Sequence, residues 1–445
     1  MKNPLKKLSS FQTIILGFIS VILIGALLLT LPFASRAEGC ASFIDALFTS
    51  TSAACVTGLI TQDTATYWTL FGQIVIIILI QIGGLGVVTI TAAFAMISGR
   101  KIGLMQRNTM QDSISAPQVG GIVRLTSLAI RITFTVEIIG ALLMMPSFCS
   151  EFGIVKGIWY SIFHSISAFC NAGFDLMGTR EKFSSLTSFT GNVPINIVVM
   201  LLIIIGGIGF LTWDDVKTHK FKLKKYRMQS KVILVTSGIL ILFPAIYYFF
   251  EFGGDSWDMT MKERITSAVF QAVTPRTAGF NTVDLSMLKG GGTVIMIFLM
   301  LIGGSPGSTA GGMKTTTVAV LFSSAVSVFR KKKDAGFFGR RISDETIKNA
   351  AAILIMYLVI FLGGAVAICG IEGAPIRSCL FETASAIGTV GLSLGLTPSL
   401  GTVSHIILII MMFLGRVGGL TVIYAAVSGN HTNVSKLPLE KITVG

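Results

Sequence analysis

The sequence predicts an all-α polytopic membrane protein built from four pseudo-fourfold-related repeats, each a helix, a short half-helix, a loop and a second helix. Three observations support this prediction: the apolar composition, the placement of charge, and a pattern that recurs four times. Of the 445 residues, 52% are hydrophobic and 13% are charged, against about 25% charged residues in a typical soluble domain. The mean hydropathy of +0.79 leaves too little polar surface to coat a water-soluble globule.

The net charge of +14 is concentrated in a few segments. Basic residues gather in Lys2–Lys7, Arg100–Arg124, Lys217–Lys231 and Arg330–Lys348, whereas the complementary loops are slightly acidic. This is the positive-inside pattern of a multi-pass protein of the plasma membrane, and it places the basic loops and both termini in the cytoplasm. The placement argues against nucleic acid as a partner. An acidic protein partner, anionic membrane lipid and plain solvation of the basic loops all stay open.

Each repeat is expected to begin and end with a long apolar helix, most of them near the ~20 residues that cross a bilayer. The first helices are predicted at 11–33, 125–145, 232–252 and 350–370, and the second at 71–98, 193–210, 293–328 and 405–427. Eight spans follow. The predicted units are repeat 1 over 1–98, repeat 2 over 99–216, repeat 3 over 217–330, and repeat 4 with the C-terminal tail over 331–445.

Between the long helices of each repeat lies a short amphipathic segment, which as a helix spans only half a bilayer. Each segment carries a phenylalanine, and a glycine follows it by ten residues, or by nine in the third repeat. The pairs are Phe48 and Gly58, Phe163 and Gly173, Phe270 and Gly279, and Phe381 and Gly391. A single such loop would be explained as a connection, but four in register indicate a common function.

Backbone inside the membrane must direct its carbonyl groups at a partner, because each unsatisfied group costs several kcal/mol. Loops that surround a pore meet this need by pointing carbonyls at a dehydrated cation, and glycine permits the positive φ that such a turn requires. We therefore interpret the four turns as a selectivity filter around a central ion pore. The candidate ion-binding residues are Val56, Thr57, Gly58, Asn171, Ala172, Gly173, Thr277, Ala278, Gly279, Thr389, Val390 and Gly391.

A second glycine pattern recurs in the second helices. It reads Gly83-Gly84-Leu85-Gly86, Gly206-Gly207-Ile208-Gly209, Gly303-Gly304-Ser305-Pro306 and Gly415-Arg416-Val417-Gly418. Paired glycines allow either close helix packing or a bend, and the sequence does not choose between these.

In the third repeat this pattern must break the helix, because five glycines and a proline fall within ten residues. Unwound backbone near the middle of the membrane is tolerated where it lines a wet cavity, so we predict a gate there. The gate residues are Gly303, Gly304, Ser305, Pro306, Gly307, Ser308, Thr309, Ala310, Gly311 and Gly312, with Arg416 at the same depth. Arg416 is either a positive barrier bonded to the loop carbonyls or a structural arginine satisfied elsewhere.

The sequence gives little indication of a metal, nucleotide or catalytic site. Six scattered cysteines and four histidines form no metal-ligand pattern, and no glycine-rich nucleotide motif is complete. We therefore expect no cofactor on this chain and no enzymatic activity. A sodium-driven organic-solute symporter would show two inverted halves instead of four parallel repeats. A hydrolase using Ser305 or Ser308 with His164 or His405 lacks an aspartate and a nucleophile elbow.

These motifs resemble the Trk/Ktr/HKT superfamily of potassium transporters over nearly the whole chain, most closely the KtrB-type membrane subunit of the bacterial Ktr branch. The segments that carry the resemblance are Val56-Thr57-Gly58-Leu59, Asn171-Ala172-Gly173-Phe174, Thr274 to Phe280, Gly388 to Leu392, and the broken helix. Pro306 departs from the small residues usual in that helix.

The resemblance implies potassium uptake by a homodimer with one pore per chain, and sodium often stimulates the flux. It also implies a cytoplasmic nucleotide-binding ring of the KtrA or KtrC type, which would hold ATP/ADP or NAD(H) and act on the loop. Glycine instead of serine at position 58 implies a preference for potassium.

Overall fold

The computed structural model describes residues 9–37, 39–98, 102–114, 120–220 and 222–419, together with Thr421. The basic segment Lys2–Lys7, Arg100, and residues 422–445, which include the end of the helix predicted at 405–427 and the C-terminal tail, lie outside the described residues. The side on which the termini lie therefore stays a prediction.

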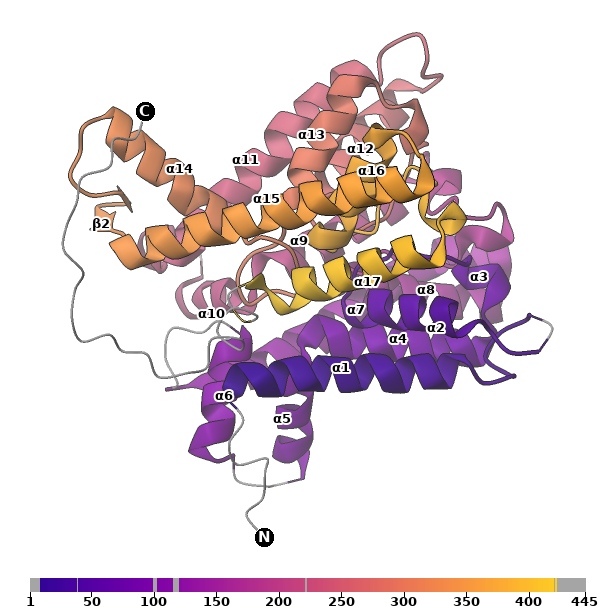
Figure 1. Ribbon diagram of the computed structural model, residues 1–445, viewed down its shortest axis with the longest axis horizontal. Helices are drawn as coiled ribbons and strands as arrows, with labels where there is room; N and C mark the ends of the chain where they lie inside the picture. The colour runs from indigo at the N-terminus through magenta and orange to yellow at the C-terminus, as the bar shows by residue number, and fades with distance from the viewer. Residues whose placement is uncertain are drawn as a thin grey trace.

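The described chain is almost entirely helical (Figure 1). Its first part contains α1 (Ser10–Leu29), α2 (Phe43–Ala54), α3 (Thr64–Tyr67), α4 (Leu70–Leu85), α5 (Val87–Ile97) and α6 (Leu104–Ile114). The second contains α7 (Ile122–Phe152), α8 (Ile154–Phe169), α9 (Val193–Ile208) and α10 (Phe210–His219). The third contains α11 (Met228–Glu251), α12 (Met261–Val273), α13 (Gly290–Leu301), α14 (Thr315–Phe329) and the hairpin of β1 (Gly336–Phe337) and β2 (Arg340–Arg341). The last contains α15 (Asp344–Glu372), α16 (Ile376–Gly388) and α17 (Thr402–Val417).

Four helices are long and apolar enough to cross a membrane alone, namely α1, α7, α11 and α15. These are the predicted first helices, and each extends close to its expected range. The bent pairs α4–α5 and α9–α10 bring the number of candidate spans to six, while α13, α14 and α17 are shorter apolar helices. The predicted count of eight spans therefore remains a prediction.

One of the predicted second helices is not continuous, which corrects the expectation from the sequence, and another ends two residues early, at a bend. The helix predicted at 71–98 bends by 91° between α4 and α5, and the one predicted at 193–210 ends at a bend of 95° between α9 and α10. Gly86 and Gly209 occupy the bends with φ of 85° and 97°. Such values suit glycine because it lacks the Cβ that makes positive φ unfavourable, so the last glycine of the recurring pattern ends the helix.

The predicted break in the second helix of the third repeat is present in the structure. The helix α13 ends at Leu301 and α14 begins at Thr315, so residues 302–314 connect them without helix.

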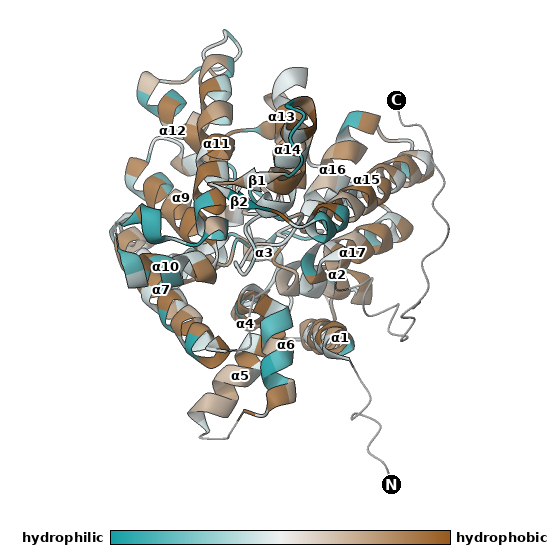
Figure 2. Cartoon of the chain, turned by 90° about the vertical axis from the view of Figure 1, so that its left-hand side faces the viewer, coloured by the Kyte–Doolittle hydropathy of each residue, from teal (hydrophilic) through white to brown (hydrophobic). Residues whose placement is uncertain are grey.

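The four half-helices are α2, α8, α12 and α16. Their buried anchors are the four phenylalanines Phe48, Phe163, Phe270 and Phe381, each with no exposed surface. Both α8 and α12 begin four residues earlier than expected, at Ile154 and Met261. Figure 2 shows α4, α9, α13 and α17 on successive sides of the molecule, and hydrophobic residues, coloured brown, predominate along helices such as α7, α11 and α15.

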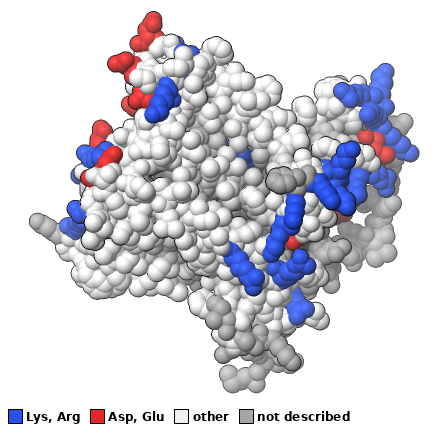
Figure 3. All heavy atoms as spheres, turned by 180° about the vertical axis from the view of Figure 1, so that it is seen from behind, with Lys and Arg blue, Asp and Glu red and all other residues white. Residues whose placement is uncertain are grey.

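Charged side chains divide between opposite ends of the molecule (Figure 3). Lysine and arginine gather at the end that holds α14 and the hairpin, while aspartate and glutamate predominate at the other end. This separation is the three-dimensional form of the loop asymmetry in the sequence, and it agrees with a multi-pass arrangement across a membrane.

Candidate functional site

The four glycine turns share an unusual backbone geometry. Each turn glycine has a positive φ, between 69° and 92°. The residue two positions earlier is also left-handed, although it is never glycine: Val56 (53°), Asn171 (58°), Thr277 (65°) and Thr389 (52°). A left-handed non-glycine residue costs about 1–2 kcal/mol, and such strain persists only where the surroundings enforce it, commonly at ligand sites.

The turn glycines contact one another in a closed ring. A Cβ added to Gly58 would lie 2.5 Å from the Ala172 carbonyl oxygen, and one added to Gly173 would lie 2.7 Å from that of Ala278. In the same way, Gly279 faces the Val390 carbonyl and Gly391 faces the Thr57 carbonyl. Each turn therefore meets the carbonyl of the next repeat, and the fourth meets the first. The predicted residues of the four loops are thus brought together around one axis.

A hydroxyl group four residues after each anchoring phenylalanine braces its turn, a feature that the sequence analysis missed. Ser52 and Ser385 accept hydrogen bonds from the amides of Gly58 and Gly391, each at 3.0 Å. In the other two repeats the hydroxyl donates to the carbonyl after the turn glycine, from Ser167 to Phe174 and from Thr274 to Phe280. The spacing Phe-x3-Ser/Thr, present in all four segments, is the signal that would have revealed it.

The polar residue directly after each phenylalanine has a less regular role. His164 Nε2 lies 3.3 Å from the Leu176 amide, and Glu382 accepts from Leu394 and from two hydroxyls beyond the fourth turn. Thr49 and Gln271 at the equivalent positions have no hydrogen-bond partner among the described residues. His164 therefore braces a loop and is not hydrogen-bonded to Ser305 or Ser308, which removes support for the hydrolase alternative.

The loop 303–312 bonds to the glycine patterns of the neighbouring repeats. Its amide at Ser305 donates to the Gly207 carbonyl at 3.0 Å, and its amide at Gly312 donates to the Gly415 carbonyl at 3.2 Å. A Cβ on Gly311 would overlap the hydroxyl of Thr389, and one on Gly312 would lie 2.8 Å from the Gly388 carbonyl. The loop therefore lies directly against the fourth glycine turn.

Two cationic side chains bind the carbonyls of this loop. Arg416 donates to the Thr309 carbonyl and also to the carbonyls of Gly83 and Gly84 on α4. Lys314 Nζ donates to the carbonyls of Ala310 and Gly311, at 2.8 and 3.3 Å. The bond of Arg416 to the loop agrees with the first of its two interpretations, and the bonds to α4 agree with the second. Its role as a barrier stays a prediction. Lys314 was not singled out from the sequence.

Two further charged residues lie beside the ring. Arg276, next to the third turn, is 4% exposed and donates to Ser237 on α11 at 2.9 Å, so its guanidinium group is directed toward α11. Glu137 on α7 is 4% exposed and accepts from Gln81 Nε2 on α4 at 3.1 Å. The described residues contain no group of three or more metal-ligating side chains that could hold a resident metal ion.

Comparison with known proteins identifies the family. A family model described as "Cation transport protein" (TrkH) matches residues 1–434. The chain belongs to the TrkH family of cation transport proteins. This family consists of transporters, which agrees with the prediction that the chain is not an enzyme.

The relatives cover the whole chain. The potassium/sodium uptake protein NtpJ of Enterococcus hirae is 39% identical over 100% of this chain and 99% of its own length. The Ktr system potassium uptake protein B of Bacillus subtilis is 38% identical over 95% of this chain and 94% of its own. The resemblance to the Ktr branch is therefore confirmed.

A solved structure shows the same fold. The potassium transporter TrkH from Vibrio parahaemolyticus superposes with a TM-score of 0.74 at 19% identity, covering 95% of this chain and 85% of that one. This TrkH-family chain is accordingly an all-α, multi-pass membrane protein.

Proposed function

We propose that the chain takes up potassium across the plasma membrane through the ring of four glycine turns, with the loop 303–312 as its gate. The observation that carries the proposal is the closed ring, in which each turn glycine faces the carbonyl of the next repeat. Carbonyl oxygens around one axis are the ligands that replace the hydration shell of a monovalent cation. The relatives named as a potassium/sodium uptake protein and a potassium uptake protein support potassium as the cargo.

The candidate ligands are the backbone carbonyls of residues 56–58, 171–173, 277–279 and 389–391. Side chains contribute little to this chemistry, because the four segments share glycine alone. A filter built from main-chain oxygens tolerates this variation, whereas a filter of side-chain ligands would not. Sodium is the second candidate cation, since the Enterococcus relative is named for both ions.

The gate proposal rests on the bonds between the loop and the second helices around it. Amides of the loop donate to Gly207 and Gly415, and Arg416 connects the loop to α4. Opening therefore requires these hydrogen bonds to break together. We further infer regulation by a cytoplasmic nucleotide-binding ring, because three relatives carry the name of the Ktr system. The distribution of basic loops supports cytoplasmic termini, and the family resemblance implies a homodimer.

Uptake of radioactive rubidium into liposomes that hold the purified chain tests the proposal. We expect uptake that excess potassium blocks, that amino acids and sugars do not block, and that deletion of residues 304–311 raises. A chain that remains folded but moves no rubidium, with or without the loop, would overturn the proposed pore. Uptake that the deletion leaves unchanged would overturn the gate alone. Adding the ring subunit with each nucleotide then tests the regulation.

A further inference from the structure

The bend between α9 and α10 is bonded to the loop 303–312. The first amide of α10, at Phe210, has no partner within its own helix, and it donates to the Gly307 carbonyl of the loop at 2.7 Å. Next to it, a Cβ on Gly209 would lie 2.6 Å from the Pro306 carbonyl oxygen. The start of α10 therefore cannot move without changing its contacts with the loop.

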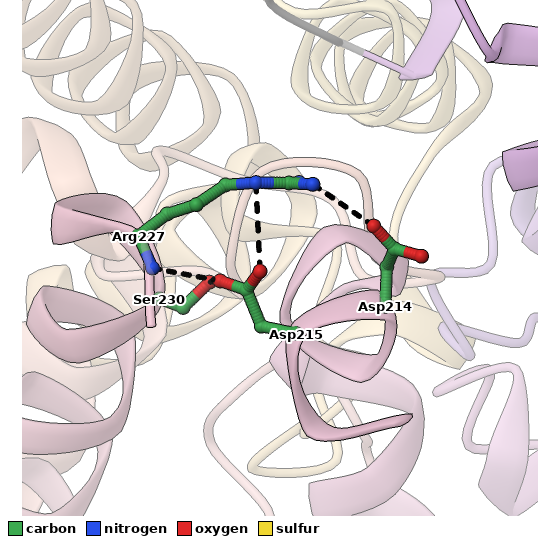
Figure 4. Close-up of polar contacts among 4 residues, drawn as sticks. All are labelled: Asp214, Asp215, Arg227 and Ser230. Atoms are coloured by element: carbon green, nitrogen blue, oxygen red, sulfur yellow. Dashed lines mark hydrogen bonds and ion pairs between the residues drawn. The ribbon is translucent and has the colours of Figure 1, made fainter. Parts of the chain in front are cut away.

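The other side of α10 is held by one buried carboxylate, Asp215 (Figure 4). Asp215 is 2% exposed. One of its oxygens accepts from the Arg227 amide at 3.0 Å and from the Ser230 hydroxyl at 2.6 Å, and the other lies 3.5 Å from Arg227 Nε. Arg227 precedes α11 and Ser230 lies in its first turn, so Asp215 joins α10 to the beginning of the next repeat.

The neighbouring residue Asp214 is less buried than Asp215 and has fewer partners. Its side chain is 20% exposed and contacts one partner, Arg227 Nη2, at 2.9 Å. Arg227 is itself 49% exposed, and exposed ion pairs of this kind contribute little, typically ~0–1 kcal/mol. Both aspartates lie on the same turn of α10 and have the same charge, but only Asp215 is buried with three donors around it.

These contacts form one mechanical connection. The helix α10 has 10 residues and is therefore a rigid unit ~15 Å long. Gly307 is bonded to its first residue and Asp215 holds its middle, while the bend itself is braced by Trp213 Nε1, which donates to the Ile205 carbonyl at 3.0 Å. A shift of α10 away from α11 would pull on the loop through the bond between Phe210 and Gly307.

We propose that Asp215 is a positioning residue for the gate. It fixes α10 against the start of α11, and α10 in turn holds the loop 303–312 in the bonded arrangement described above. This inference rests on the proposed gate function of the loop. It adds that the closed arrangement depends on a carboxylate at the basic end of the molecule, outside the ring and the loop themselves.

The test compares rubidium uptake by liposomes containing Asp215→Asn, Ser230→Ala or Asp214→Asn, each in the full chain. Asp215→Asn should raise uptake by about fivefold or more, the scale of a typical coupling between sites, with the rubidium KM unchanged because the ring is untouched. Ser230→Ala removes one of the three bonds and should raise uptake by less. Asp214→Asn should behave as wild type.

The decisive measurement repeats these substitutions in the chain lacking residues 304–311. If Asp215 acts through the loop, Asp215→Asn has no further effect there. An effect that persists in the deletion chain, or uptake by Asp215→Asn no higher than by Asp214→Asn, would overturn the inference. If Asp215→Asn does not fold, Ser230→Ala takes its place in the same comparison. Failure of the gate proposal is distinct, since the deletion alone would then leave uptake unchanged.

Discussion

The carboxyl group of Glu137 accepts a hydrogen bond from Gln81 within the interior, 3.1 Å from the amide nitrogen. The Glu137 carboxyl group also lies 3.8 Å from the sulfur of Cys170, the residue before the left-handed Asn171 of the second turn, and the Glu137 backbone carbonyl accepts from Ser165. This single residue therefore connects α7, α4 and the base of the second turn.

Replacement of Glu137 should separate its hydrogen-bonding role from its charge. Glu137→Ala leaves the Gln81 amide without its partner, which costs about 1–3 kcal/mol for a buried polar group, whereas Glu137→Gln keeps an acceptor in place. We expect a lower unfolding temperature in detergent for the alanine variant and a near wild-type value for the glutamine variant. Equal stability of the alanine variant and wild type would contradict this role.

The ring should not tolerate a side chain on its turn glycines. Gly58→Ala places a methyl group against the Ala172 carbonyl and forces alanine to a φ of 91°. Left-handed strain alone costs about 1–2 kcal/mol, which corresponds to about 5- to 30-fold, and the clash with the carbonyl adds to it. Rubidium uptake should therefore fall at least about fivefold. Gly363→Ala on α15 is the control, since its methyl group meets no described atom within 4 Å. Normal uptake by Gly58→Ala would argue against the ring as the pathway.

The hydroxyl braces should affect ion preference more than folding. Ser385→Ala removes the acceptor of the Gly391 amide, a hydrogen bond of about 1 kcal/mol, and so loosens one turn. We expect the ratio of potassium to sodium uptake to fall about fivefold. Thr383→Val is the matched control because that hydroxyl bonds within its own helix, to the Cys379 carbonyl. A similar change of the ratio in both variants would count against a specific brace.

Arg416 should restrain the loop through the hydrogen bonds that its guanidinium N–H groups donate. Arg416→Gln loses the bonds to Thr309, Gly83 and Gly84, so uptake should rise by about fivefold or more. Arg416→Lys keeps the charge but not the planar fork, and should give an intermediate rise. Arg377→Gln serves as control, since Arg377 also bonds a backbone carbonyl, that of Leu288, but does not contact the loop. Lower uptake by Arg416→Gln would contradict a restraining role.

The sequence predicts the turns well because their constraint is local. A half-helix, a phenylalanine and a glycine at fixed spacing specify each turn without knowledge of the others. The order of contacts around the ring depends on residues more than a hundred positions apart, such as Gly58 and Ala172. No single segment encodes that order.

The sequence predicts neither the position of the bends nor the contacts of Asp215, and the reasons for the two omissions differ. Gly86 and Gly209 sit in patterns that suit both a straight, closely packed helix and a bent one, and only tertiary contacts decide between them. Asp215 lies next to Asp214, directly before the basic loop Lys217–Lys231, and the sequence does not distinguish the two aspartates. The partners of Asp215 are the amide of Arg227, which precedes α11, and the hydroxyl of Ser230 in the first turn of α11.

The closed ring consists of four different sequences in one polypeptide. In an assembly of four identical subunits, one altered codon changes all quarters of the ring together. Here a substitution such as Gly58→Ala alters one quarter and leaves three intact, so each quarter can acquire changes separately during evolution. The proposed gate likewise belongs to one repeat, so its opening is a single event, with no need for four copies to act in concert.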